Sequence, residues 1–129
     1  VSGVACPLWA AIVEAGEADS PGADYFVQKR INQLMRKDRD IDTIILGCTH
    51  YPLLMSSVAK NVPNGVRIVA QGTYVANSLK DYLCRHPEMQ RKLTQGGTCQ
   101  YFTSESEERF SQTARIFLHE DVAVRHVDL

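Results

Sequence analysis

The feature that most constrains the fold is the run Thr43-Ile44-Ile45-Leu46, which lies unbroken between Asp42 and Gly47. A strand with one solvated face alternates apolar and polar residues, whereas this run is largely β-branched and has no such alternation. The run therefore predicts a short strand that is buried on both faces of a parallel sheet. The rest of the chain should then supply further strands that alternate with helices.

Helical patterns flank this strand on both sides. Before it, Ser20 is a predicted N-cap, Pro21 fits the first helical position, and apolar residues at helical spacing predict an amphipathic helix over Asp24–Lys37. After it, a turn over Gly47–His50 leads into a helix with Pro52 in its first turn. The order is therefore helix, strand, turn and helix.

The same alternation continues toward the C-terminus. The sequence predicts strands over Val66–Ala70, Cys99–Thr103 and Val122–Val127. It predicts helices from the apolar stripe of residues 75–83 and from a capping box in which Ser104 is the N-cap. The predicted fold class is therefore α/β, with a mostly parallel sheet and flanking helices.

Composition excludes several classes of protein. The 129 residues carry 14 Lys and Arg against 15 Asp and Glu, so no polybasic surface is expected for nucleic acid or an anionic membrane. No apolar run approaches the roughly 20 residues of a membrane helix, and no signal-peptide pattern opens the chain. The four cysteines form no C-x-x-C pair, which predicts reduced thiols. We expect a cytoplasmic protein that binds neither nucleic acid nor membrane.

The candidate site is the turn that follows the strand at residues 43–46. Ligands of open parallel sheets bind at the carboxyl ends of strands, and here Cys48, Thr49 and His50 place a thiol, a hydroxyl and an imidazole together. A helix N-terminus and a protonated imidazole favour a thiolate, so Cys48 is a candidate base or nucleophile. His50 is then a candidate proton acceptor or donor, and Thr49 a candidate carboxylate ligand.

Other interpretations of these residues stand beside this one. A cysteine after an apolar strand is more often a packing residue than a catalytic one. A metal site at Cys48 and His50 would need a second pair of ligands, and none occurs at usable spacing, so we expect no metal. A nucleotide site is also not expected, because the chain has neither a G-x-G-x-x-G nor a Walker sequence.

The run I-L-G-C-T-H-Y-P-L-L at residues 45–54 resembles the second cysteine motif of glutamate racemases. Ala5–Leu8 and Ile12–Glu14 resemble the active-site segment that precedes that motif in the family. The enzymes of this family are considerably longer and carry an Asp-Ser-Gly and a Cys-Asn-Thr motif, which do not occur here. Together with the apolar start at Val1, this predicts a C-terminal fragment of a two-domain racemase of the aspartate/glutamate racemase type.

The resemblance implies a cofactor-independent isomerase that interconverts L- and D-glutamate for peptidoglycan and cell-wall biosynthesis. Such chemistry uses two bases on opposite faces of the substrate carbon. The resemblance implies that Cys48 is one of the two catalytic cysteines, that His50 assists it, and that Thr49 and Glu14 bind the substrate. Ala11 stands where the family often has proline, and we expect it to loosen a turn before Glu14.

The resemblance also implies a domain organisation. Residues 1–72 would form the later part of the second α/β domain, and residues 73–129 would return to complete the first. The first catalytic cysteine and the N-terminal half of the parent enzyme are then missing, so we expect this chain alone to be inactive. Two such chains pairing through their open sheet edges would form a homodimer.

Two further functions remain open at this stage. One is a related cysteine enzyme, either an amino-acid or hydantoin racemase or a decarboxylase, that uses the same fold. The other is a non-catalytic α/β interaction domain in which Cys48 only packs.

Overall fold

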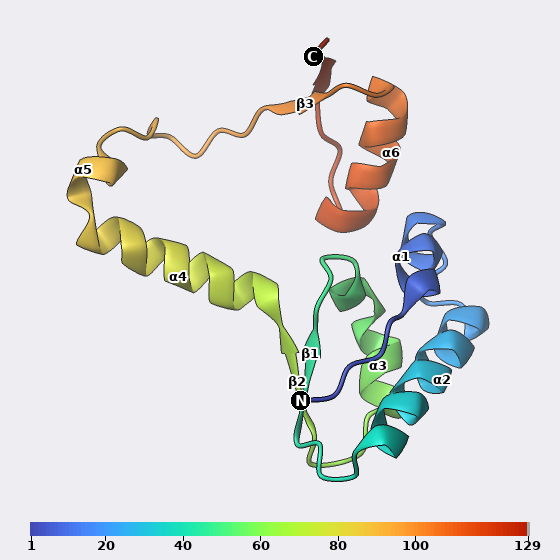
Figure 1. The fold of residues 1–129 in the computed structure, drawn as a ribbon. Helices are drawn as coiled ribbons and strands as arrows, with labels where there is room; N and C mark the ends of the chain where they lie inside the picture. Colours follow the sequence, from blue (N-terminus) through green and yellow to red (C-terminus); the bar gives the residue numbers. More distant parts are fainter. Residues whose placement is uncertain (129) are drawn as a thin grey trace. The chain divides into compact units, whose positions relative to one another are not determined.

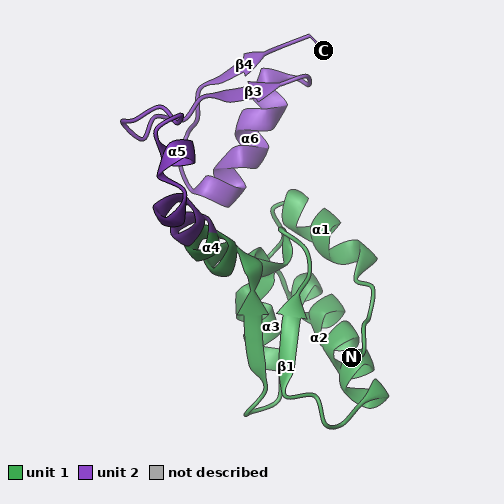
Figure 2. Ribbon diagram, turned by 60° about the vertical axis from the view of Figure 1, so that its left-hand side comes forward, with its two compact units in different colours: residues 1–78 green, residues 79–129 purple. Residues whose placement is uncertain are grey.

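The computed structural model describes residues 1–128, which form two compact units that divide after Ser78 (Figure 2). Strands and helices alternate along the chain, so the predicted α/β class with parallel strands and flanking helices is confirmed. In chain order the elements are α1 (Pro7–Glu14), α2 (Pro21–Lys37), β1 (Thr43–Leu46), the 3-10 helix η1 (Tyr51–Leu54), α3 (Met55–Asn61), β2 (Arg67–Ala70), α4 (Gln71–Arg85), α5 (Pro87–Gln90), β3 (Tyr101–Thr103), α6 (Glu107–Leu118) and β4 (Val124–His126) (Figure 1).

Strand β1 forms where the sequence predicts it and pairs in parallel with β2, from Thr43 opposite Arg67 to Leu46 opposite Ala70. Helices α2 and α3 lie on one face of this two-stranded sheet (Figures 1 and 2). Leu46 faces them and is buried, whereas Ile45 on the other face is 64% exposed. Burial of β1 on both faces is therefore a wrong prediction for this chain, because its described helices cover one face only.

Helix α2 begins as the sequence predicts. The Ser20 hydroxyl accepts a hydrogen bond from the Ala23 backbone N–H at 3.1 Å, and Pro21, which has no N–H to satisfy, occupies the first helical position. One face of the helix buries Ala23, Val27 and Ile31. The cap and the apolar face together fix both the start of α2 and the side that packs on the sheet.

Helix α1 corrects the expectation of a loosened turn before Glu14. Pro7 starts this helix, Ala11 lies in its middle, and Trp9 and Val13 are buried on its inner face. Alanine suits a helix interior, where proline would remove a hydrogen bond and clash with the preceding turn. Gly16, at a φ of 74°, follows the helix and donates to the Val13 carbonyl at 2.9 Å.

A part-buried hydrogen bond joins α3 to α2. Ser57 is 1% exposed, and its hydroxyl donates to the carboxylate of Asp24. Lys60, one turn further along α3, places its ammonium 3.4 Å from the other carboxylate oxygen. The hydrogen bond from Ser57, aided by Lys60, holds the pKa of Asp24 below its usual range.

The second unit contains the parallel pair β3 and β4, with helix α6 against β4. The predicted N-cap Ser104 is wrong: the helix begins at Glu107, and Ser106 caps it by accepting from the Arg109 N–H at 3.3 Å. The Glu107 carboxylate accepts a hydrogen bond from the backbone N–H of His126 in β4 at 2.6 Å. Glu107 therefore serves a contact between α6 and β4 in place of the predicted capping box.

The apolar stripe of α4 is present, but it faces solvent. Tyr74, Val75, Leu79 and Tyr82 are 40 to 63% exposed, and none of the residues of this helix is buried. The helix itself is therefore correctly predicted from its periodicity, while its apolar face has no cover among the described residues.

The Asp24–Ser57 hydrogen bond predicts a pH dependence of stability in the first unit. A carboxyl whose pKa is depressed on folding adds stability above its unfolded-state pKa of about 3.9, and that stability is lost as the pH falls through the lower folded-state pKa. Between about pH 6 and pH 2.5, the unfolding free energy should fall more in the wild type than in Asp24→Asn. Urea unfolding followed by the fluorescence of Trp9, the single tryptophan, measures this difference.

The control is Glu17→Gln, which neutralises an exposed carboxylate of the same unit. This variant should retain the pH dependence of the wild type. Equal losses for the wild type and Asp24→Asn would contradict the assigned role of the hydrogen bond.

Candidate functional site

The turn at the carboxyl end of β1 holds the three side chains that the sequence singles out. The backbone N–H of Tyr51 donates to the Cys48 carbonyl at 3.3 Å, and that of Leu53 donates to the His50 carbonyl at 3.1 Å. These bonds wind the chain directly from the strand into the 3-10 helix η1. Cys48 and His50 are half-buried there, and Thr49 is exposed.

The imidazole of His50 connects all four predicted site residues. Its Nδ1 lies 3.8 Å from the Cys48 sulfur and 3.4 Å from the Thr49 hydroxyl oxygen, and its Nε2 lies 3.1 Å from a carboxylate oxygen of Glu14. An ionised carboxylate only accepts hydrogen bonds, so Nε2 carries the proton. In the neutral ring Nδ1 is then an acceptor that faces the thiol and the hydroxyl.

Helix α1 brings Glu14 to this turn from 36 residues away in the sequence. Glu14 is the last residue of the helix, and α1 contacts η1 directly. The side chains of Glu14 and His50 are 58% and 24% exposed, so solvent screens the pair and it adds little to stability. Its effect is to orient the imidazole and to supply negative charge beside a protonated ring.

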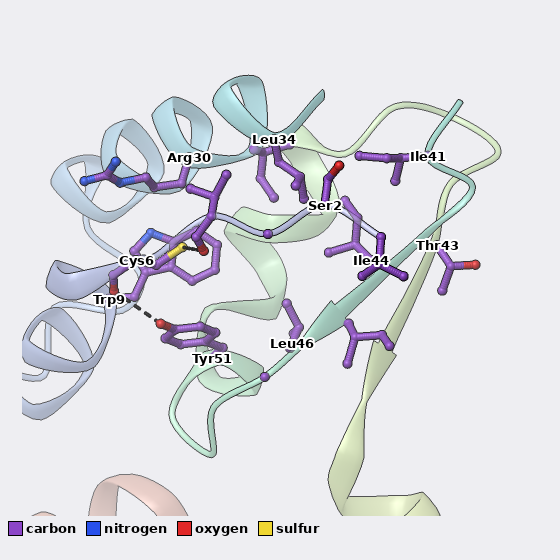
Figure 3. Close-up of a pocket in the computed structure, with 16 residues that line it drawn as sticks. Ser2, Cys6, Trp9, Arg30, Leu34, Ile41, Thr43, Ile44, Leu46 and Tyr51 are labelled. Carbon is purple, nitrogen blue, oxygen red and sulfur yellow. Dashed lines mark hydrogen bonds between the residues drawn. The ribbon is translucent and has the colours of Figure 1, made fainter. Parts of the chain in front are cut away.

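Tyr51 is a neighbour of this site that sequence reasoning missed. Its hydroxyl donates to the Cys6 carbonyl at 3.3 Å, and its ring packs edge-on against Trp9, with centroids 4.9 Å apart at 68° (Figure 3). Burial, followed by the charges of Cys6 and Cys48, raises the pKa of the Tyr51 phenol. The position of Tyr51 directly after His50 is the one sequence signal that pointed to it.

A cavity of about 350 Å³ lies beside Tyr51 (Figure 3). Most of its wall is apolar, from the N-terminal segment, α2 and β1, and Cys6 and Arg30 also line it. The four predicted site residues are not part of this lining, although Gly47 and Tyr51, which flank them in the turn, are. Burial raises the pKa of the Cys6 thiol, although the charge of Arg30 partly opposes this.

Residues 1–128 contain neither a side-chain cluster that could hold a metal ion nor a helix that could span a membrane. No group of three or more His, Cys, Asp or Glu side chains in that range is arranged to hold a metal ion. No helix in the described part of the chain has the length and apolar character needed to cross a membrane.

Comparison with known proteins finds no matching family model but many curated relatives. A glutamate racemase of Thermoanaerobacter sp. (strain X514) is 35% identical over 126 residues, which is 97% of this chain and 46% of that protein. A glutamate racemase of Lactiplantibacillus plantarum is 32% identical over 97% of this chain and 45% of its own length. The chain therefore spans a little under half the length of these relatives.

Solved structures show the same relationship. The glutamate racemase isoform RacE1 of Bacillus anthracis matches with a TM-score of 0.78 and 32% identity, over 96% of this chain and 45% of that one. The glutamate racemase of Thermus thermophilus, solved in complex with β-chloro-D-alanine, matches with a TM-score of 0.79 and 27% identity, over 96% of this chain and 46% of its own.

The raised pKa of Cys6 predicts an order of thiol reactivity. Because the thiolate is the nucleophile, Cys6 should react with iodoacetamide near pH 8 several-fold more slowly than Cys84 and Cys99, which are exposed. Mass spectrometry of the separate peptides gives each rate. In concentrated guanidinium the rates should converge, and a Cys6 that reacts as fast as the exposed thiols in the folded chain would contradict the effect of burial.

Proposed function

We propose that this chain carries one half of a glutamate racemase active site. Nearly its whole length is similar to glutamate racemases, whereas the matched part is less than half of the length of those proteins. The observation that supports this most directly is the contact series from Glu14 through His50 to Cys48. This series joins a carboxylate, an imidazole and a thiol at the carboxyl end of a parallel strand, where α/β sheets bind ligands.

In this proposal Cys48 is the base for one enantiomer of glutamate. His50 Nδ1 accepts the thiol proton, and the Glu14 carboxylate stabilises the imidazolium that forms. The thiolate then removes the α-proton of glutamate: the Cα–H bond breaks, an S–H bond forms, and the electron pair stays on the substrate carbon. A thiol on the opposite face returns a proton to that carbon, which inverts it, and no cofactor takes part.

Thr49 is the proposed substrate contact in the turn. Its side chain is exposed next to Cys48, and its hydroxyl can donate to a substrate carboxylate once it turns from the imidazole. Glu14, exposed on the other side of His50, is the proposed partner of the substrate ammonium. The site would thus offer a hydroxyl donor for the carboxylate of an α-amino acid and a carboxylate for its ammonium group.

The second thiol would come from the N-terminal half of the parent enzyme. We propose that residues 1–72 belong to the second domain of that enzyme and that residues 73–129 return to complete the first. The parent would act in the cytoplasm, where it supplies D-glutamate for peptidoglycan. With one of its two bases absent, the 129-residue chain would bind glutamate without inverting it.

The proposal predicts that Cys48 reactivity depends on His50 and on glutamate. His50→Asn removes the proton acceptor and should slow alkylation of Cys48 at about pH 7.5 by roughly tenfold. Either enantiomer of glutamate at millimolar concentration should slow alkylation of the wild type, and aspartate should not. Peptide mapping by mass spectrometry follows Cys48 alone.

The matched control is His86→Asn, which removes an exposed imidazole that also pairs with a carboxylate, that of Glu88. It should leave Cys48 unchanged. If His50→Asn also leaves the rate unchanged and glutamate gives no protection, Cys48 is a packing residue and the proposal fails. Protection by aspartate alone would move the assignment to a related amino-acid racemase.

The isolated chain is also predicted not to racemise glutamate. The ellipticity of L- or D-glutamate solutions should stay constant when the purified chain is added, because inversion needs a proton donor on the opposite face. A signal that decays with the wild type, and stays constant with Cys48→Ala, would overturn this prediction.

A further inference from the structure

Tyr51 is bonded through its backbone to the turn that holds Cys48 and through its side chain to helix α1. Its N–H donates to the Cys48 carbonyl at 3.3 Å, so its main chain moves with that turn. Its hydroxyl crosses to α1 and donates to the carbonyl of Cys6, the residue that caps this helix, at 3.3 Å. The two elements are thus joined through one residue.

The first turn of α1 is held firmly where Tyr51 contacts it. The Cys6 carbonyl accepts a second hydrogen bond, from the Trp9 N–H at 3.1 Å, which uses the other lone pair of this oxygen. Trp9 is 3% exposed and lies edge-on to the Tyr51 ring (Figure 3). Its indole N–H donates to the Phe26 carbonyl of α2 at 3.4 Å. Tyr51 therefore contacts a fixed point of the unit.

Glu14 lies at the opposite end of the same short helix. The eight residues of α1 form one uninterrupted helix about 12 Å long, which sets the distance between its two ends. His50 and Tyr51 are consecutive, so two adjacent residues contact α1, Tyr51 at its start and His50 at its end. The screened Glu14–His50 pair alone would hold this geometry weakly, and the hydrogen bond and ring contact of Tyr51 add a further attachment beside the buried Trp9.

We infer that Tyr51 is a positioning residue, which places the carboxylate of Glu14 against the imidazole of His50 by anchoring the start of α1 to the Cys48 turn. The raised pKa of the phenol keeps its hydroxyl protonated, and therefore a donor, through the neutral pH range. The inference rests on the proposed function in giving Cys48 the role of a base. The coupling between the side chains can be measured without any substrate.

The experiment is a double-mutant cycle in the full 129-residue chain, with the alkylation rate of Cys48 as its readout. The four chains are the wild type, Glu14→Gln, Tyr51→Phe and the double variant. Glu14→Gln should slow Cys48 alkylation by about fivefold when Tyr51 is present, the upper end of what a screened pair contributes. In the Tyr51→Phe background the same change should have an effect of less than about twofold.

A residue with a merely structural role would lower the melting temperature without changing this coupling. Circular dichroism therefore accompanies each rate, to show that every chain is folded. Tyr25→Phe, which removes an exposed hydroxyl on α2, is the matched control and should leave the fivefold effect intact. Should Tyr51→Phe fail to fold, Trp9→Phe perturbs the same anchor, and it should also reduce the effect of Glu14→Gln.

An effect of Glu14→Gln that stays fivefold in folded Tyr51→Phe would overturn the inference, as would the absence of any effect in the wild type. Neither result depends on glutamate. A chain that shows the coupling but no protection by glutamate would support the role of Tyr51 while refuting the proposed function. If the coupling is absent while glutamate still protects Cys48, the role of Tyr51 is refuted and the proposed function is supported.

Discussion

The buried packing of α1, α2, η1 and α3 is the constraint on which the first unit depends. Val13, Val27, Leu54 and Val58, one from each of these elements, have no exposed surface. Their burial brings α1 alongside the turn that follows β1, and within that packing Glu14 and His50 make contact across 36 residues of sequence. The polar cluster is therefore a product of apolar packing, and its own screened contacts orient side chains without holding the fold together.

The candidate site is open to solvent on one side. Thr49 is exposed, Glu14 is more than half exposed, and the parallel pair of β1 and β2 has one uncovered face in the described structure. The two-base racemisation proposed above needs a proton acceptor and a proton donor on opposite faces of the substrate carbon, and Cys48 would supply one of the two. An arrangement of this kind fits the observation that the curated relatives are about twice as long as this chain.

The sequence predicted the features that depend on neighbouring residues. Ser20 and the strand Thr43–Leu46 lie where expected, because a cap and a β-branched run act locally. The N-cap at Ser104 was wrong because Glu107 bonds to β4 instead, a contact that no local pattern contains. The exposed face of β1 was missed for a similar reason. Its apolar composition indicates that the strand suits burial, but composition does not tell whether the residues that would cover it belong to the same chain.

The residues of the candidate site also differ in whether local sequence could predict them. Cys48, Thr49 and His50 are consecutive, so their proximity followed from sequence, and Glu14 was added through a family resemblance. The anchor that Tyr51 forms with Cys6 and Trp9 joins segments more than 40 residues apart and became visible only in the fold.

Helix α4 has a consequence of its own. Its 15 residues include none that is buried, and a helix of that length is marginal in water without packing. Its helical content is therefore governed by mass action: any surface that covers the apolar stripe from Tyr74 to Tyr82 stabilises the helix by an amount that rises with the logarithm of its concentration once that exceeds the Kd. The segment that leads from one unit to the other is thus a part of the chain whose order depends on its surroundings.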